Sequence, residues 1–138
     1  PTNQGPVIKT LMLRPIEDII EDDKVVLNPI MFDYDKQNIK AQAAFELDKL
    51  VAIMKKYPTM EIKVESHTDH SGTAVYNMAL SNRRAASTVQ YIISKGINKA
   101  RLTSQGFGKT KPLFDCGSNC TKEQNDKNRR SNFIITKR

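Results

Sequence analysis

Two stretches with helical spacing, separated by one with strand spacing, constrain the fold of this chain more than any other feature. Between residues 38 and 57, apolar side chains recur three and four positions apart at Ala43, Leu47, Leu50, Val51 and Met54. Between residues 73 and 94, a second such stripe is predicted at Val75, Ala79, Ala86, Val89 and Ile93. The intervening residues alternate, with Met60, Ile62 and Val64 separated by charged side chains, which predicts a strand with one buried face. Both helices are therefore expected to pack on a sheet that contains this strand.

The rest of the chain continues the alternation of strands and helices. Further strands are predicted, where β-branched and aromatic residues dominate, at 25–34, 101–106 and 130–136. Asn38 is predicted to cap the first helix, Pro58 and Gly96 to end the two long helices, and Thr121 with Gln124 to form a capping box for a short third helix. The order β-α-β-α-β-α-β predicts an α/β (α+β) two-layer sandwich with the helices on one face of a mixed sheet.

Length and charge set the class of the protein. The 138 residues suit one domain, with 1–23 as a lead-in segment or linker (a candidate strand at 7–13, then an acidic turn or short helix) and 24–138 as the domain. No apolar run approaches a membrane span, and the start of the chain predicts a piece of a longer protein whose signal peptide or lipid anchor lies outside it.

The net charge of +7 is uneven, because residues 95–138 hold 11 Lys and Arg against 3 Asp and Glu. This end suggests an anionic partner such as nucleic acid, a membrane surface or a cell wall. Nucleic acid is disfavoured, because there is no Trp and the aromatic content is 7%.

The two cysteines enclose Gly-Ser-Asn, a spacer that disfavours helix and predicts a tight loop. A disulfide between Cys116 and Cys120 would stiffen that loop and imply an oxidising compartment. Two free thiols in a cytosolic protein are the alternative.

The stretch His67-Thr68-Asp69-His70-Ser71-Gly72 leads from the end of a strand into the start of a helix, where ligands bind in α/β proteins. Helical spacing predicts that Asn77, Ser81 and Arg84 form one polar stripe below that loop. The Asp69 carboxylate and the Arg84 guanidinium would complement the ammonium and the carboxylate of a zwitterion. Both charged side chains are expected to lie largely on the surface.

From about Val25 to the C-terminus, the segments HTDHSG, YNMALSNRRA, GFGKTKP and NDKNRRSNF, with FDYDKQNI before the first helix, closely resemble the OmpA-like C-terminal domain. That domain is shared by OmpA-type porins, peptidoglycan-associated lipoproteins and flagellar stator proteins. The cysteine loop resembles members from Bacteroidota, in which this domain often ends a large envelope lipoprotein. Where the family usually has Gly and an apolar residue, this chain has Ser66 and Ser131.

The resemblance implies a non-catalytic domain of an outer-membrane protein or lipoprotein that works in the periplasm and needs no cofactor or metal. It would bind peptidoglycan at the diaminopimelate of the peptide stem, and other envelope or secretion-complex proteins are further candidate partners. The residues that match the family's motifs are Asp69 for the ligand ammonium, Arg84 for its carboxylate, Asn77 as a supporting contact, Asp35 at the rim, and Thr68 and Ser71 for backbone or hydroxyl contacts. Asn128 and Arg129 belong to the Asn-Arg-Arg turn, which is interpreted as mainly structural.

Four other interpretations fit parts of the sequence. His67, His70, Cys116 and Cys120 are zinc-type ligands, although their spacing is unusual. A hydrolase would use either histidine with Ser71 and Asp69, although sequence neighbours rarely form such triads. Gly108-Lys109-Thr110 imitates the end of a phosphate loop but lacks the required upstream glycine, since Thr103 stands there. A protein-interaction module of an envelope complex, with little or no peptidoglycan binding, is the fourth.

Overall fold

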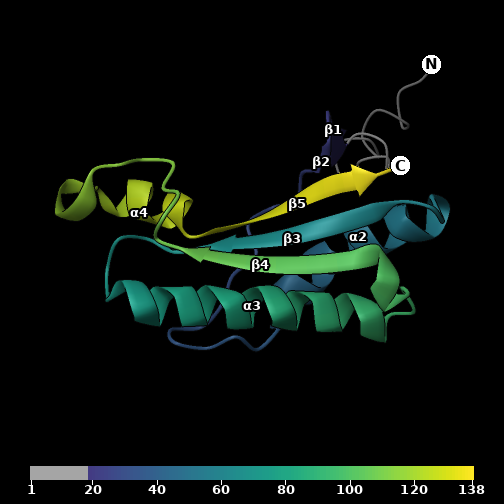
Figure 1. Cartoon of the computed structure of the whole chain (residues 1–138), viewed down its shortest axis with the longest axis horizontal. Helices are drawn as coiled ribbons and strands as arrows, with labels where there is room; N and C mark the ends of the chain where they lie inside the picture. The colour runs from purple at the N-terminus through teal and green to yellow at the C-terminus, as the bar shows by residue number, and fades with distance from the viewer. Residues whose placement is uncertain (1–18) are drawn as a thin grey trace, which may run out of the picture.

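A mixed sheet forms the centre of the structure, a computed structural model that describes residues 19–138 (Figure 1). Its strands are β1 (Ile20–Glu21), β2 (Lys24–Val25), β3 (Glu61–His67), β4 (Leu102–Gly108) and β5 (Arg130–Lys137). The α-helices are α2 (Ala41–Lys56), α3 (Ala74–Ser94) and α4 (Lys122–Asn128), with short 3₁₀ turns at Lys99–Arg101 and Gly117–Asn119. The strand order is β1-β2-β5-β3-β4, in which only β3 and β4 run parallel. None of the helices in the described part of the chain is both long and apolar enough to cross a membrane.

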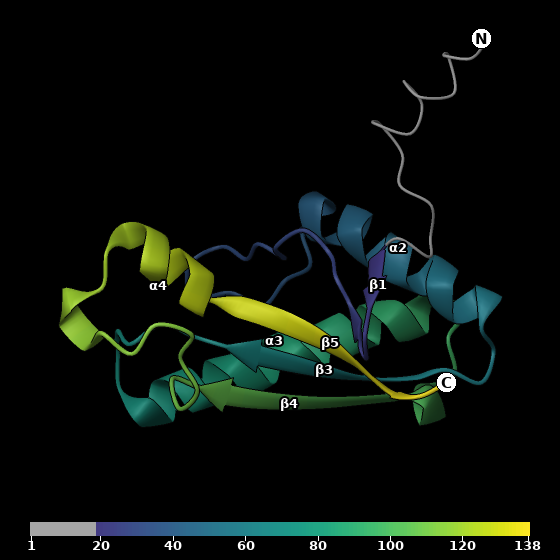
Figure 2. The same ribbon diagram turned by 90° about the horizontal axis from the view of Figure 1, so that it is seen from above.

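The two long helices cover one face of the sheet, as the sequence predicted (Figure 2). The register pairs Val64 with Phe133 and Ile62 with Ile135, so these buried side chains share the face that meets the helices. Against them pack fully buried side chains of the helices, including Leu47, Leu50, Met54 and Ile92. The predicted two-layer α/β sandwich is therefore confirmed. The short helix α4 lies beyond the end of the sheet, in line with β5 (Figures 1 and 2).

The predicted buried stripe of α3 is wrong at three of its positions. Ala79 and Ala86 are exposed and Val75 is 81% exposed, whereas Asn77 and Ser81 are buried. The cause lies in β4, which meets α3 along its length. Its glycines bring the two backbones so close that only small or hydrogen-bonding side chains fit between them.

The segment 25–34 is not one strand, because only Lys24–Val25 pairs with β5. Beyond it, side chains of α2 take the hydrogen bonds that a strand neighbour would make. The Asn28 amide donates to Glu46, the Met31 amide donates to Gln42, and Gln42 donates to the carbonyl of Pro29.

Helix boundaries agree with the sequence except at the start of α2. The predicted cap by Asn38 is wrong, since Lys40 occupies the cap position without a side-chain hydrogen bond. The capping box of Thr121 and Gln124 is confirmed. Gly96, at φ 102°, follows the last turn of α3 in the left-handed conformation that favours glycine. The predicted strand 7–13 and the start of the acidic segment lie outside the described residues, while Ile20–Glu21 of the predicted lead-in pairs with β2.

Candidate functional site

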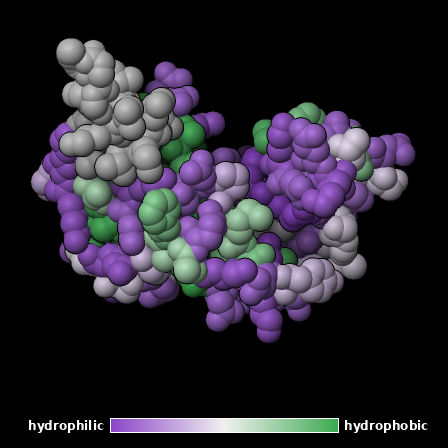
Figure 3. Space-filling model, turned by 180° about the vertical axis from the view of Figure 1, so that it is seen from behind, coloured by the Kyte–Doolittle hydropathy of each residue, from purple (hydrophilic) through white to green (hydrophobic). Residues whose placement is uncertain are grey.

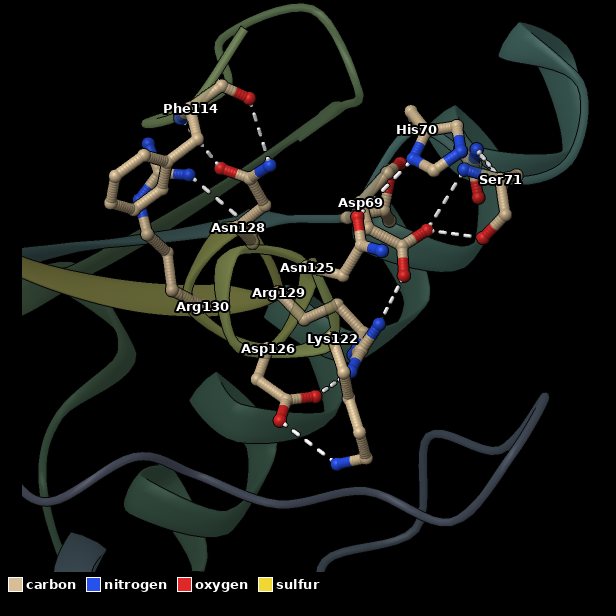
Figure 4. A network of polar contacts seen from close by, with 12 residues as sticks. Asp69, His70, Ser71, Phe114, Lys122, Asn125, Asp126, Asn128, Arg129 and Arg130 are labelled. Atoms are coloured by element: carbon tan, nitrogen blue, oxygen red, sulfur yellow. Dashed lines mark hydrogen bonds and ion pairs between the residues drawn. The ribbon is translucent and has the colours of Figure 1, made fainter. Parts of the chain in front are cut away.

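Three segments that are distant in sequence meet at the carboxyl end of β3. They are the loop 68–72 that leads into α3, the last turn of α4, and the segment 32–36 that precedes α2. Figure 4 shows the loop and α4 facing each other, with Arg129 reaching from α4 toward Asp69. Seen from the opposite side to Figure 1, the surface is hollowed between the body of the molecule and the lobe that carries α4 (Figure 3).

Asp69 is the most buried charged group of this region, with 9% of its surface exposed, so the expectation of a largely exposed side chain is wrong. Its Oδ1 accepts hydrogen bonds from the Ser71 amide (2.9 Å) and the Ser71 hydroxyl, and its Oδ2 accepts one from Arg129. Burial raises the pKa of Asp69, but these hydrogen bonds and the Arg129 charge outweigh it and bring the pKa below its usual value. The carboxylate is therefore ionised at neutral pH.

Arg84 projects from α3 toward the segment before α2 and is half-buried. Its Nε donates to the Lys36 carbonyl (2.8 Å), its Nη2 donates to the Asp33 carbonyl (3.2 Å), and the guanidinium lies 4.8 Å from the centre of the Phe32 ring. Within residues 19–138, its Nη1 has no hydrogen-bond partner and no ion pair joins it to Asp69. Burial is the main cause that lowers the pKa of Arg84, and the charge of Arg129 adds to it.

Arg129 joins the end of α4 to the loop that carries Asp69, a contact that the sequence did not indicate. One guanidinium nitrogen pairs with Asp69 and another with Asp126 of the same helix. Because the positive charge of Arg129 acts on both Asp69 and Arg84, the three side chains belong to one electrostatic cluster. The only sequence signal for this role was its place in the Asn-Arg-Arg motif, which was interpreted as structural.

The other residues singled out in the sequence hold the loop and its surroundings. The side-chain amide of Asn77 donates to the Ser71 carbonyl, and the buried Thr68 hydroxyl donates to the Asp69 carbonyl. Ser81 is fully buried, donates to the Met78 carbonyl and accepts from the Gly108 amide, so it faces β4 rather than solvent. The predicted polar stripe is therefore divided, since Arg84 alone faces the segment before α2.

Asp35 lies at the rim of the site, in the left-handed backbone conformation (φ 58°). It accepts a hydrogen bond from the Tyr76 hydroxyl, which links the segment before α2 to the first turn of α3. The pKa of Tyr76 is raised, and the hydrogen bond to Asp35 is the largest cause. Both side chains are exposed.

Asn128 fixes the loop on the far side of Asp69. Its side chain, 1% exposed, accepts from the amides of Leu113 and Phe114 and donates to the Phe114 carbonyl. The tip of this loop is closed by the Cys116–Cys120 disulfide, with the two Cα atoms 5.0 Å apart, as predicted. The loop encloses a small cavity of about 60 Å³ between Asn128 and residues 68–70.

The comparison with known families decides the identity of this arrangement. A family model described as "OmpA family" matches residues 31–129, the span that contains the whole cluster. The chain belongs to the OmpA family. Over 87 residues, this OmpA-family domain is 41% identical to a peptidoglycan-associated lipoprotein of Rhizobium meliloti (strain 1021), covering 63% of this chain and 49% of that protein. Over 113 residues it is 40% identical to outer membrane protein A of Bordetella avium, covering 81% of this chain and 57% of that protein.

A solved structure shares the fold of this OmpA-family domain. The crystal structure of the peptidoglycan-associated lipoprotein from Burkholderia pseudomallei matches with a TM-score of 0.68 at 25% identity, covering 77% of this chain and 87% of that one. The chain spans about half the length of the curated relatives it matches first. The relation therefore concerns this domain.

The side chains that suggested a zinc site or a hydrolase triad do not come together in this OmpA-family domain. Cys116 and Cys120 are joined to each other, and the described residues contain no group of three or more His, Cys, Asp or Glu side chains able to hold a metal ion. His67 is buried and stacks on Phe107 with ring centres 5.0 Å apart, while His70 contacts Asn125. Within residues 19–138 neither imidazole contacts the Ser71 hydroxyl, which bonds to Asp69 instead.

Proposed function

We propose that this domain binds peptidoglycan non-covalently, without catalysis, through the diaminopimelate of the peptide stem. It would thereby anchor an outer-membrane-associated protein or lipoprotein to the cell wall from the periplasm. The proposal is carried by two features of one site: the ionised, sheltered carboxylate of Asp69, and the Arg84 guanidinium, one nitrogen of which has no partner within residues 19–138. The family supports the same reading, since relatives at 41% and 39% identity are peptidoglycan-associated lipoproteins.

The Asp69 carboxylate retains capacity for one more donor. A carboxylate offers roughly four lone-pair sites, and three are used here, by the Ser71 amide, the Ser71 hydroxyl and Arg129. A ligand ammonium is therefore expected to join Arg129 at Oδ2 without displacing it. Because Asp69 is largely buried, its charge is screened little by water, which strengthens its attraction for an ammonium.

Arg84 is expected to take the ligand carboxylate. Its contacts with the Lys36 and Asp33 carbonyls and the Phe32 ring hold the guanidinium in one orientation, so little side-chain entropy remains to be lost on binding. The remaining nitrogen can donate a charge-assisted hydrogen bond. Diaminopimelate has an ammonium and a carboxylate on the same carbon, which suits two opposite charges at one small site.

The test compares binding of purified variants to cell-wall sacculi with their thermal midpoints. Losing either charged contact should cost roughly 1.5–3 kcal/mol, or about 10- to 150-fold in affinity. The intact affinity for a stem peptide should be weak, about micromolar to millimolar, because the ligand is small and polar. At about 0.15 M salt, where attraction between exposed charges is screened, Asp69→Asn and Arg84→Ala should therefore no longer sediment with sacculi. Arg83→Ala, at the neighbouring exposed arginine, should behave as wild type.

Amidation of the diaminopimelate carboxylate in a stem peptide provides the second arm. It should weaken binding to wild type far more than to Arg84→Ala, since the two changes remove the same contact. Folded Asp69→Asn and Arg84→Ala proteins that still sediment like wild type at about 0.15 M salt would refute the proposed site.

A further inference from the structure

The N-terminal half of α3 exposes an apolar surface that the fold does not use. Val75, 81% exposed, lines a shallow depression of about 430 Å³ together with Ala74, Met78, Ala79 and Asn82. We call these five residues the α3 strip. They lie at positions that share one side of the helix, so they form a continuous surface.

Packing of α3 does not require the α3 strip to be apolar. The helix turns Asn77 and Ser81 toward β4, where the Ser81 hydroxyl accepts the Gly108 amide and Asn77 holds the preceding loop. Single exposed apolar side chains are ordinary, whereas several that lie side by side around a depression can form an interaction site. Within the strip, Asn82 accepts the Gly106 amide of β4, so the members available to a partner without disturbing the sheet are the apolar ones: Ala74, Val75, Met78 and Ala79.

Charges around the α3 strip are positive at both of its ends. Arg83 lies next to Asn82 at one end, and α3 contains no acidic residue. At the other end, the Lys109 ammonium donates to the Gly72 carbonyl (2.7 Å), immediately before the positive N-terminus of the helix. A second copy packed antiparallel on the same strip would bring its Arg83 against this N-terminus, which like-charge repulsion disfavours.

We propose that the α3 strip docks an acidic segment of a partner envelope protein, with apolar side chains against Val75 and Met78 and carboxylates toward Arg83 and Lys109. The occupant is a protein segment rather than a second copy of this chain, because the charges at both ends of the strip are cationic. Val75 and Arg83 make no hydrogen bond or ion pair with Asp69 or Arg84 within residues 19–138, so variants at these two positions separate docking from peptidoglycan binding. Lys109 does not serve for this, because its ammonium also holds the His70 and Gly72 carbonyls of the loop that carries Asp69.

Site-specific photo-crosslinking in the intact protein, expressed in its host cells, tests this inference. A photoreactive amino acid at position 75 should give a discrete adduct whose sequenced peptide is acidic and partly apolar. The same amino acid at Gln90, an exposed position farther along α3, should not. Adducts with a second copy, with lipid or with peptidoglycan, equal adducts at both positions, or no adduct at position 75 would each overturn the proposal.

Variants of the intact protein then separate charge from apolar contact, using the crosslinked peptide in synthetic form as the probe. Arg83→Glu should weaken binding by about two- to fivefold, as expected for an exposed charge pair. Val75→Asp should weaken it by roughly tenfold or more, because it places a carboxylate in an apolar contact. An acidic residue in the first turn favours the helix, so Val75→Asp should fold.

The control Gln90→Asp adds the same charge away from the strip and should leave peptide binding unchanged. Val75→Asp should also sediment with sacculi like wild type, and loss of that binding would overturn the separation of the two surfaces.

Discussion

Burial alone would favour a neutral Asp69, yet its neighbours keep it ionised. The loop supplies two donors from Ser71, and α4 supplies the guanidinium of Arg129. Because the pKa is lowered on folding, the stability that ionised Asp69 contributes is present above its unfolded pKa and is lost as the pH falls through the folded value. A residue proposed to capture ligand is therefore also part of the folded structure.

Replacing Arg129 should show how far the pKa of Asp69 and the stability of the fold depend on this contact. In Arg129→Ala the pKa of Asp69 should rise, and the free energy of unfolding at neutral pH should fall by about 1–2 kcal/mol, since Arg129 is partly exposed. Carboxyl-carbon NMR titration and urea unfolding measure the two effects. Asp126→Asn removes the other partner of Arg129 and should leave the Asp69 titration close to wild type. An unchanged Asp69 titration in Arg129→Ala would contradict this account.

His67 makes folding sensitive to mild acid. It is 4% exposed, stacks on Phe107, and neither ring nitrogen has a hydrogen-bond partner within residues 19–138. Burial, together with the nearby charges of Arg130 and Lys111, lowers its pKa to about 4, against the opposing charge of Glu65. The unfolded chain therefore binds a proton between about pH 6.5 and 4 that the folded domain does not.

The resulting prediction is a loss of stability as the pH falls through that window. Its size should approach roughly 3 kcal/mol, from the difference between the unfolded and folded pKa values. Urea unfolding at a series of pH values should show this slope in wild type and in His70→Gln, and a much smaller slope in His67→Phe. If His67→Phe retains the wild-type slope, another group is responsible.

At the scale of elements, the approach of α3 to β4 sets the geometry of the site. A Cβ atom on Gly106 would lie 2.4 Å from the Asn82 backbone nitrogen and 2.4 Å from the Ser81 hydroxyl oxygen. The side chains of Asn82 and Ser81 also accept the amides of Gly106 and Gly108, which satisfies two donors at the open edge of β4. This contact fixes α3, and with it Arg84, relative to the loop of Asp69.

Gly106→Ala should therefore be among the most damaging small substitutions in the domain. The obstructing atoms include the backbone of Ser81 and Asn82, so α3 must move away from β4, at a cost of about 3 kcal/mol or more. Ser104→Ala, at an exposed position of the same strand, is the matched control and should change the free energy of unfolding little. Denaturant midpoints for the two variants test this, and a Gly106→Ala protein as stable as Ser104→Ala would show that the helix is less closely held than the structure indicates.

Local patterns predicted the elements whose cause is local. The alternation at 60–64 and the capping box at Thr121 depend on neighbouring residues, and both were found. The buried face of α3 was mispredicted because the glycines of β4, about 25 residues later, select it. The segment 25–34 was mispredicted because its amides bond to α2 side chains 11 and 18 residues away.

In the candidate site, too, local patterns predicted some features, and contacts between distant segments determine the others. Asp69 and Arg84 were singled out because the loop and helix spacing lie close together in sequence and match a family motif. The Arg129 contact spans 60 residues, so no local pattern indicates it. Burial of Asp69 was also missed, because its surroundings include segments distant in sequence, namely Arg129 and the loop 109–117.

On the scale of the whole molecule, charge affects how binding to the cell wall must be measured. The formal charge is +7, and all of the excess lies in residues 95–138, which include α4 and β5. A polymer rich in carboxylates attracts such a domain whatever its specific site does. Asp69→Asn removes a negative charge and so strengthens this general attraction while removing the proposed specific contact.

Ionic strength should separate the two components. At about 0.01 M salt the screening length is roughly 30 Å, so wild type and Asp69→Asn should both sediment with sacculi. At about 0.15 M it falls to roughly 8 Å, which suppresses attraction between exposed charges but acts less on a sheltered pair such as Asp69 with a bound ammonium. Wild type should then remain bound and be displaced by free diaminopimelate, whereas Asp69→Asn should remain in solution. Equal retention of both proteins at the higher salt, or wild-type binding that diaminopimelate does not displace, would mean that general charge attraction rather than the Asp69–Arg84 cluster holds this domain to the wall.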